Sequence, residues 1–520
     1  MNRTNFRKCL SFLISVLSGP KSEDVSPEIK PPEKYITPSV NIQVYRLIIS
    51  QIIFKDLLEY LPEYQILELE SDPDFKQMCF KFLKNKFKMR SINNFGPVDS
   101  SVKHVYTRVH NVGKLSKFTK LKSLKLDNHD DYKDYSYLVN TVNEITTLKS
   151  LDITPGFIPL ESLDILRIEH LKSISMSTVP TEKLLNRMTN FSALGLNLGY
   201  SSNIIFKYLG SMMKLTKLDI TLGYENDTFN ENINKLINLK DLRICGLSRL
   251  KETLKLDNPK LDNLTLYGRC CVSFKGINVR QLTIGYIRLP LNKYEDISQM
   301  SRLRNLTIDT NELTDDLFAP ITKMVDLEKL TVRFCKLTNV TFETAEWPKL
   351  YYLHIPYNEV TSNVFYKFKC LRYLNICSNK ISKFEGIPRL SNLFKLNIRS
   401  NKLSPENFQE IFKLTKLRSL DIQWTVYNIN HFNGIQNLTN LRKLNINHND
   451  HYDSWNPARL EWLRSLKKLE TLKINLKYFS LGTIDVLCEM SNLRRLEIYG
   501  ITKDQSEPIW KMPKLEYASF

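Results

Sequence analysis

Few side chains in this sequence have types and spacings that could do chemistry. His448, Asp450, His451 and Asp453 lie close together and could offer two imidazoles and two carboxylates to a metal ion. The adjacent thiols of Cys270 and Cys271 could be redox-active. However, Asn, Asp and His are common solvated residues of turns, and small residues after a strand usually serve packing. We therefore expect neither a metal site nor a redox centre.

The motifs that mark common enzyme classes do not occur in the sequence. It contains no Gly-x-Gly-x-x-Gly, no Gly-x-x-x-x-Gly-Lys-Ser/Thr and no Gly-x-Ser-x-Gly. Glycine is scarce, with 16 residues among 520, although phosphate-binding loops depend on it. We expect no catalytic residue and no cofactor, so any function must come from binding.

A repeat dominates the chain and must position the residues that bind. Four segments that start at Leu327, Leu350, Leu371 and Leu393 follow the pattern L-x-x-L-x-L-x-x-N/C-x-L. Weaker copies start at Leu121, Leu148, Leu171, Phe191, Leu215, Leu239, Leu261, Val279, Leu303, Leu417, Leu441, Leu469, Leu493 and Leu515. The chain thus holds about 18 units with a mean spacing of about 23 residues.

This pattern resembles the leucine-rich repeat, which implies an α/β solenoid with a curved parallel sheet. Apolar residues at positions 1, 4 and 6 form the inward face of a short strand and the turn that enters it. One unit cannot bury this face without its neighbours. Asn358, Asn379, Asn401 and Asn449 are expected to satisfy backbone groups in the turns, and Cys335 takes the same place in its unit. Residues 405–414 predict helical turns on the convex side.

Strand residues between the buried positions are expected to line the concave face. In the well-formed repeats these residues interleave Lys and Arg with Tyr, which suits an acidic or phosphorylated peptide, and Arg can bind such groups in a bidentate manner. The same residue types are also common as solvated residues of a basic protein. The predicted substrate-binding residues are Lys329, Arg333, Tyr352, His354, Tyr373, Asn375, Lys395, Asn397, Arg399 and Lys443.

The chain ahead of the repeats divides into three parts. Residues 1–40 predict a flexible tail with a Pro-rich linker, residues 41–90 a small all-helical module, and residues 91–120 a connector and N-terminal cap. The repeat solenoid is expected over residues 121–520. Since 520 residues exceed what a single core can organise, a chain of several parts is the natural expectation.

The helical module resembles the central part of an F-box. Tyr60-Leu-Pro62 ends an apolar helix, and the following Ile-Leu-x-Leu opens the next one, although the family's Leu-Pro opening and its Val-Cys-Lys/Arg-x-Trp segment are missing. The resemblance implies that the module grips a Skp-type adaptor and a cullin scaffold, and that the chain is a substrate receptor of a ubiquitin ligase. The adaptor-binding residues would be Leu57, Leu58, Leu61, Pro62, Ile66 and Leu67. Alternatively, the helices simply cap the first repeat.

Two other functions are compatible with the sequence. The chain could be a repeat scaffold or regulatory binding protein unconnected to ubiquitin. It could also be a secreted recognition protein, because residues 9–19 have the outline of a signal peptide and sequons such as Asn263-Leu-Thr265 occur. The nine scattered cysteines instead favour a reducing compartment, so we expect a cytoplasmic or nuclear protein.

Charge and hydropathy limit the classes of partner that we expect. The chain has 74 Lys and Arg against 55 Asp and Glu, a formal charge of +19. Because these cations are dispersed and no nucleic-acid motif occurs, we expect a protein partner and no specific nucleic acid. No apolar run long enough to span a membrane is present.

Overall fold

The structure is a computed structural model. It describes residues 90–91, 104–108, 115, 118, 120–127, 135–153, 160–177, 180–197, 204–222, 229–247, 253–268, 272–286, 289, 291–309, 313–425, 432, 434–447, 457–475, 481–499, 501 and 506–519. The chain divides into two compact units, residues 1–177 and residues 178–520. Each unit is described by itself.

The first unit contains a parallel sheet in which each strand pairs with the next along the chain. Its elements are β1 (Arg90–Ser91), β2 (His104–Arg108), β3 (Ser123–Asp127), α6 (Tyr135–Glu144), β4 (Ser150–Ile153), α7 (Leu160–Asp164) and β5 (Ser173–Met176). Val105 of β2 is fully buried and lies beside Leu124 of β3. The parallel sheet therefore starts before Leu121: β1 lies where the predicted helical module meets the predicted connector and N-terminal cap, and β2 lies within the latter.

The second unit repeats one pattern of strand, turn and short helix. Its strands are β6 (Ala193–Asn197), β7 (Lys217–Thr221), β8 (Asp241–Cys245), β9 (Leu254–Lys255), β10 (Asn263–Tyr267), β11 (Val272–Ser273), β12 (Gln281–Gly285), β13 (Asn305–Asp309), β14 (Lys329–Arg333), β15 (Tyr352–His354), β16 (Tyr373–Asn375), β17 (Lys395–Asn397), β18 (Ser419–Asp421), β19 (Lys443–Ile446), β20 (Thr471–Asn475), β21 (Arg495–Tyr499) and β22 (Tyr517–Ser519). Apart from β9 and β11, which pair with each other, all of them form one parallel sheet.

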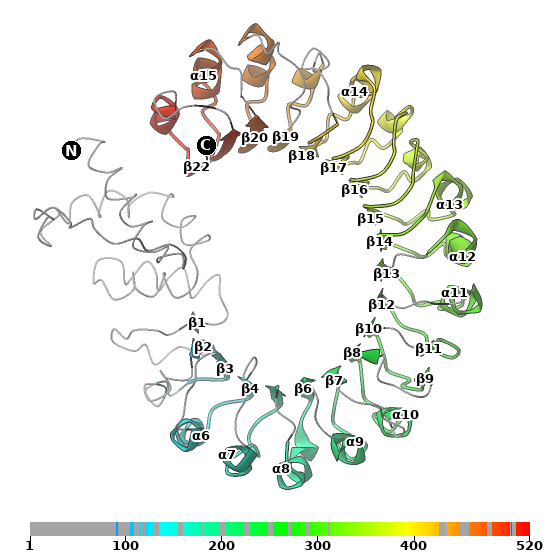
Figure 1. Cartoon of the computed structure of the whole chain (residues 1–520), viewed down its shortest axis with the longest axis vertical. Helices are drawn as coiled ribbons and strands as arrows, with labels where there is room; N and C mark the ends of the chain where they lie inside the picture. The colour runs from blue at the N-terminus through cyan, green and yellow to red at the C-terminus, as the bar shows by residue number, and fades with distance from the viewer. Residues whose placement is uncertain are drawn as a thin grey trace, which may run out of the picture. The chain divides into compact units, whose positions relative to one another are not determined.

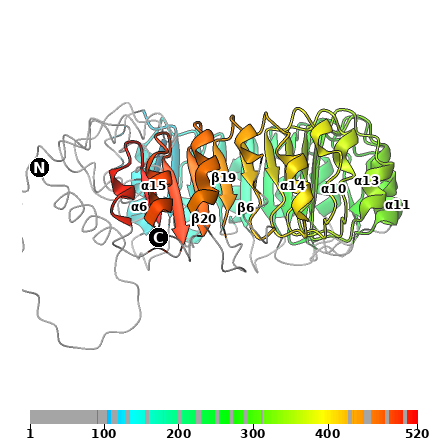
Figure 2. The same ribbon diagram turned by 90° about the horizontal axis from the view of Figure 1, so that it is seen from above.

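Short helices connect these strands. The α-helices are α8 (Glu182–Arg187), α9 (Ile204–Leu209), α10 (Phe229–Asn234), α11 (Leu291–Ser298), α12 (Asp315–Phe318), α13 (Asn339–Thr344), α14 (Pro405–Ile411) and α15 (Leu481–Cys488). The 3₁₀ helices are η2 (Met188–Asn190), η4 (Ala319–Lys323), η5 (Phe365–Lys367), η6 (Ile387–Arg389), η8 (Ile435–Asn437), η9 (Pro457–Ser465) and η10 (Ile509–Lys511). In the second unit the strands line the inner side and the helices the outer side (Figure 1). Seen from above, the successive repeats between α14 and α15 stand side by side (Figure 2).

The leucines of the repeat form the core. Leu374 and Leu396, at the fourth position of their units, have no exposed surface and face each other in register between β16 and β17. Every strand of the second unit's main sheet begins two residues after a repeat start that the sequence indicated. The repeat register is thus confirmed.

Buried asparagines close the turns after the strands, as expected. Asn379 donates from Nδ2 to the carbonyl oxygens of Ile355, Ile376 and Cys377, and its Oδ1 accepts from the backbone of Val360. Asn358 and Asn401 make the same set of contacts one unit away. We call this row the asparagine ladder. At Cys335 a thiol takes the place of the amide, and its Sγ lies 3.2 Å from the Arg333 carbonyl oxygen of its own turn.

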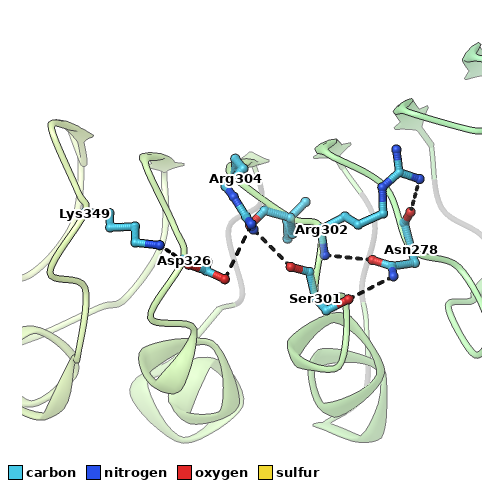
Figure 3. Close-up of polar contacts among 7 residues, drawn as sticks. Asn278, Ser301, Arg302, Arg304, Asp326 and Lys349 are labelled. Carbon is cyan, nitrogen blue, oxygen red and sulfur yellow. Dashed lines mark hydrogen bonds and ion pairs between the residues drawn. The ribbon is translucent and has the colours of Figure 1, made fainter.

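A second polar row joins the turns that enter the strands (Figure 3). The Arg302 backbone donates to Oδ1 of Asn278, and Asp326 lies between Arg304 and Lys349, forming an ion pair with each. In two stretches, residues 190–278 and 392–514, the residue just before each repeat start alternates between Asn and Lys, and in five cases the Lys Nζ donates to the Asn of the preceding unit. Such pairs are Lys214 with Asn190, Lys260 with Asn238, Lys416 with Asn392, Lys468 with Asn440 and Lys514 with Asn492. These contacts hold neighbouring strands in register.

Candidate functional site

The strands β14 to β19 bring eight of the ten predicted substrate-binding residues into two columns, and Arg333 and Arg399 follow at the seventh position of their units. Lys329, Tyr352, Tyr373 and Lys395 are direct neighbours at the third position of successive units. His354, Asn375 and Asn397 are neighbours at the fifth position, and Lys443 lies in the third-position column one strand beyond Ser419. We call these residues, with Arg333 and Arg399, the strand face. Their role in binding stays a prediction.

A pair of stacked tyrosines forms the centre of the strand face. The rings of Tyr352 and Tyr373 are 4.2 Å apart between centroids and nearly parallel, at 7°. Burial, together with the neighbouring Tyr373 hydroxyl, raises the pKa of Tyr352 to about 12. Lys395 Nζ lies 5.1 Å from the centre of the Tyr373 ring. The result is a stacked aromatic pair with an exposed lysine beside it.

His354 lies next to this pair and is uncharged at neutral pH. Burial and the nearby cations Arg333 and Lys395 lower its pKa to about 4. Its Nδ1 atom is buried and has no hydrogen-bond partner among the described residues. The imidazole therefore adds an aromatic surface and an unused polar atom, and adds no positive charge.

The two arginines of the strand face already have partners within the chain. Arg333 Nη2 donates to Oδ2 of Asp309 at 2.7 Å, and the Asp309 side chain is only 12% exposed. The guanidinium of Arg399 lies 4.2 Å from the centre of the Trp424 ring. The exposed lysines 329, 395 and 443 are consequently the cations that are most accessible to a partner.

The asparagines of the strand face serve the backbone of their own turns. Oδ1 of Asn375 accepts from the backbone N–H of Cys377 at 3.1 Å, and Oδ1 of Asn397 accepts from that of Arg399 at 3.0 Å. Asp421 makes the equivalent contact to Gln423. These side chains close the end of each strand, so their oxygens are less available to a partner than the pattern suggested.

Sequence reasoning missed a row of aromatic residues at the eighth position of the repeat. Tyr286, Phe334, Tyr357 and Trp424 are large, exposed and held in the left-handed backbone region. The signal was an aromatic residue directly before the ninth, Asn/Cys position, where several other units have Gly or Ser.

Several sequence predictions fall outside the described residues. They include the helical module at 41–90 with its proposed adaptor-binding leucines, Asn449, the His448–Asp453 cluster and Cys270–Cys271. Within the described parts of the chain, no group of three or more His, Cys, Asp or Glu side chains could hold a metal ion. The helices that are described are all too short or too polar to cross a bilayer.

In comparisons with known proteins, the repeat region is the part of the chain that matches a family model. Residues 366–519 match the family model described as a leucine-rich repeat region. No curated protein matches the chain. Among solved structures, the TLR13 complex with ssRNA13 is similar, with 17% identity, a TM-score of 0.49, and coverage of 83% of this chain and 70% of that one.

Two bacterial structures are also similar. A leucine-rich-repeat protein of Leptospira interrogans has 18% identity and a TM-score of 0.42 over 73% of this chain and 91% of its own. An internalin of Listeria monocytogenes has 18% identity and a TM-score of 0.36 over 70% and 90%. Together with the repeat pattern and the parallel sheet, the family match shows that this chain contains a leucine-rich-repeat region.

Proposed function

We propose that this chain is a non-catalytic protein-recognition subunit, and that it acts as a substrate receptor of an SCF-type cullin–RING ubiquitin ligase in the cytoplasm or nucleus. The observation that carries the recognition role is the strand face. There a stacked tyrosine pair, a neutral His354 and the exposed Lys329 and Lys395 adjoin one another on successive strands. Aromatic side chains dominate protein interfaces, and ammonium groups favour carboxylates or phosphates.

The ubiquitin-ligase part of the proposal rests on the sequence of residues 41–90. The Tyr60-Leu-Pro62 segment and the following apolar residues resemble an F-box, and the module precedes a repeat region as in F-box proteins of that kind. In such a ligase the partners transfer ubiquitin, so this chain would need only two binding surfaces.

Affinity purification of the full chain tests the ligase part. We expect a Skp-type adaptor and a cullin to co-purify with the wild type, and to be lost with the double variant Leu61→Ala, Pro62→Ala. The control Glu59→Ala, Glu63→Ala changes polar residues of the same segment and should retain both partners. If the adaptor is absent from the wild type, or present equally with all variants, the chain is better described as a repeat scaffold.

A separate charge reversal tests the strand face. Lys329→Glu with Lys395→Glu should weaken capture of the co-purifying substrate at least about tenfold, while adaptor binding stays unchanged. The control Lys183→Glu with Lys207→Glu makes the same change in net charge on α8 and α9, where both lysines are exposed. Equal losses in the two variants would mean that overall charge, and not the strand face, governs capture.

A further inference from the structure

In several repeats the eighth residue adopts a left-handed backbone, in which aromatic side chains are unusual. The φ angles are 57° at Tyr286, 53° at Phe334, 56° at Tyr357 and 56° at Trp424. A positive φ is a genuine outlier for a bulky residue. Other units place Gly246, Gly268, Ser378 and Ser400 at the same position and with the same sign of φ. The backbone thus requires no aromatic residue there.

These four residues follow β12, β14, β15 and β18 along one edge of the sheet, with Ser378 and Ser400 between Tyr357 and Trp424. We call the four the aromatic rim. The exposed fraction is 65% for Tyr286, 44% for Phe334, 51% for Tyr357 and 48% for Trp424. Each follows the carboxyl end of a strand, and the carboxyl ends of parallel strands meet at one edge of a sheet. The chain therefore combines backbone strain with exposed aromatic surface at one edge, and strained residues often mark functional sites.

The ring contacts indicate which chemistry the rim fits. Phe334 and Tyr357 stack on each other at 4.6 Å and 14°, and Arg399 covers a face of Trp424 at 4.2 Å. Because these faces are occupied, nucleic-acid bases have little room to stack between them. The exposed parts of the rings can contact apolar side chains of a protein.

The charged residues beside the rim indicate which charge a partner should carry. Lys336, Glu359, Lys380 and Lys402 hold the tenth position of successive repeats, two residues beyond the left-handed residue. Lys336 and Lys402 are exposed, and Lys380 pairs with Glu359 at 3.0 Å. Cations therefore outnumber anions along this stretch. Such a border favours carboxylates on the partner.

We propose that the aromatic rim docks an extended segment of a protein partner in which apolar side chains alternate with acidic ones. The proposal rests on the recognition role given above, but it uses a different surface from the strand face. The part of the rim from Phe334, after β14, to Trp424, after β18, spans about 19 Å at a strand spacing of about 4.8 Å, and an extended segment of about six residues covers that distance.

Fluorescence anisotropy with a defined peptide tests the proposal on the full chain. The probe is a fluorescein-labelled peptide of about ten residues in which leucine and aspartate alternate. The test variant is Phe334→Ser, Tyr357→Ser, Trp424→Ser, because the chain itself uses serine in this backbone conformation at Ser378 and Ser400. The control Val325→Ser, Val340→Ser removes exposed apolar groups outside the rim.

The expected result is binding by wild type and control, with at least about tenfold weaker binding by the rim variant. A peptide with lysine in place of aspartate should bind at least about tenfold more weakly than the acidic one. Equal binding by the rim variant overturns the proposal, as does no binding of the acidic peptide at about 1 mM. Preferential, rim-dependent binding of oligothymidylate overturns it in favour of nucleic acid.

The Lys329→Glu, Lys395→Glu variant separates the two surfaces. If the strand face does not bind substrate but the rim inference is right, the Lys329→Glu, Lys395→Glu variant captures the substrate normally and the rim variant still loses the peptide. If the rim inference alone fails, the rim variant binds the peptide normally while the charge reversal weakens substrate capture. The circular dichroism of each variant, compared with that of the wild type, confirms that the loss is not one of folding.

Discussion

The guanidinium of Arg399 lies 4.2 Å from the centre of the Trp424 ring and thereby joins the strand face to the aromatic rim. Arg399 comes from the seventh position of its unit and Trp424 from the eighth position of the next. A cation held over an aromatic ring is partly desolvated and fixed in direction. A partner that contacts Trp424 therefore also meets Arg399, so the two surfaces are coupled at this point.

The backbone strain at Trp424 can be measured with two small substitutions. Trp424→Gly and Trp424→Ala both remove the ring and its contact with Arg399, so they differ only in the backbone conformations that they allow. Because alanine resists a positive φ and glycine does not, we expect the alanine variant to be less stable by about 1 kcal/mol. Urea titration of the two variants measures this difference. Equal stability would mean that the turn relaxes to a negative φ at no cost.

Truncation of a core leucine should cause a large loss of stability. Leu374 and Leu396 are fully buried, and Leu374→Ala or Leu396→Ala should lower the free energy of unfolding by roughly 2–5 kcal/mol. Hydrogen exchange should show that protection falls first in the adjoining units, since repeats are stabilised by their nearest neighbours. Val340→Ala is the control, because Val340 is 55% exposed and its truncation should change little. A loss below about 0.5 kcal/mol at either leucine would contradict the assigned core.

The sequence predicts the main course of the fold because burial imposes a period along the chain. Positions 1, 4 and 6 must be apolar in each unit, so strands such as β16 and β17 could be located from leucines like Leu374 and Leu396 alone. Asn358, Asn379 and Asn401 were predictable for a similar reason, since each turn leaves the same backbone groups to satisfy. β2 was missed because valine and threonine replace leucine in its unit.

The lateral contacts of the candidate site could not be read from the sequence. The pairing of Arg333 with Asp309 and of Arg399 with Trp424 joins residues more than twenty positions apart, and nothing local in the chain marks either partner. The same holds for the hydrogen bonds that occupy Asn375 and Asn397, since an Asn on a strand reads equally as a surface residue. The columns of the strand face were predictable, whereas the availability of each side chain was not.

The interruption of the asparagine ladder at Cys335 predicts a stabilising substitution. Asn358 bonds to the Val332 carbonyl of the preceding unit, whereas the Cys335 thiol contacts the Arg333 carbonyl of its own turn. Cys335→Asn should add an equivalent link and raise the free energy of unfolding by about 1 kcal/mol. The reverse change, Asn379→Cys, should lower it by roughly 1–3 kcal/mol, because buried carbonyl groups lose their donor. Urea titration checks both, and a destabilised Cys335→Asn variant would show that this turn cannot accommodate the amide.

The buried imidazole of His354 predicts a decline of stability in acid. Its pKa is about 4 in the folded chain, owing to burial and to Arg333 and Lys395, and about 6.5 in an unfolded one. Between these two pH values the unfolded chain binds a proton that the folded chain does not, so the free energy of unfolding falls as the pH drops from about 6.5 to about 4.

Below a pH of about 4 both forms are protonated and this contribution is constant, with a total loss of at most about 3 kcal/mol. His354→Gln carries no titrating group and should lose correspondingly less stability over that range, which urea titrations at several pH values would measure. The C2 proton of His354 in NMR spectra should titrate with a midpoint near pH 4. A midpoint near 6.5 would show that the imidazole is solvated, and that Arg333 and Lys395 lie too far from it to matter.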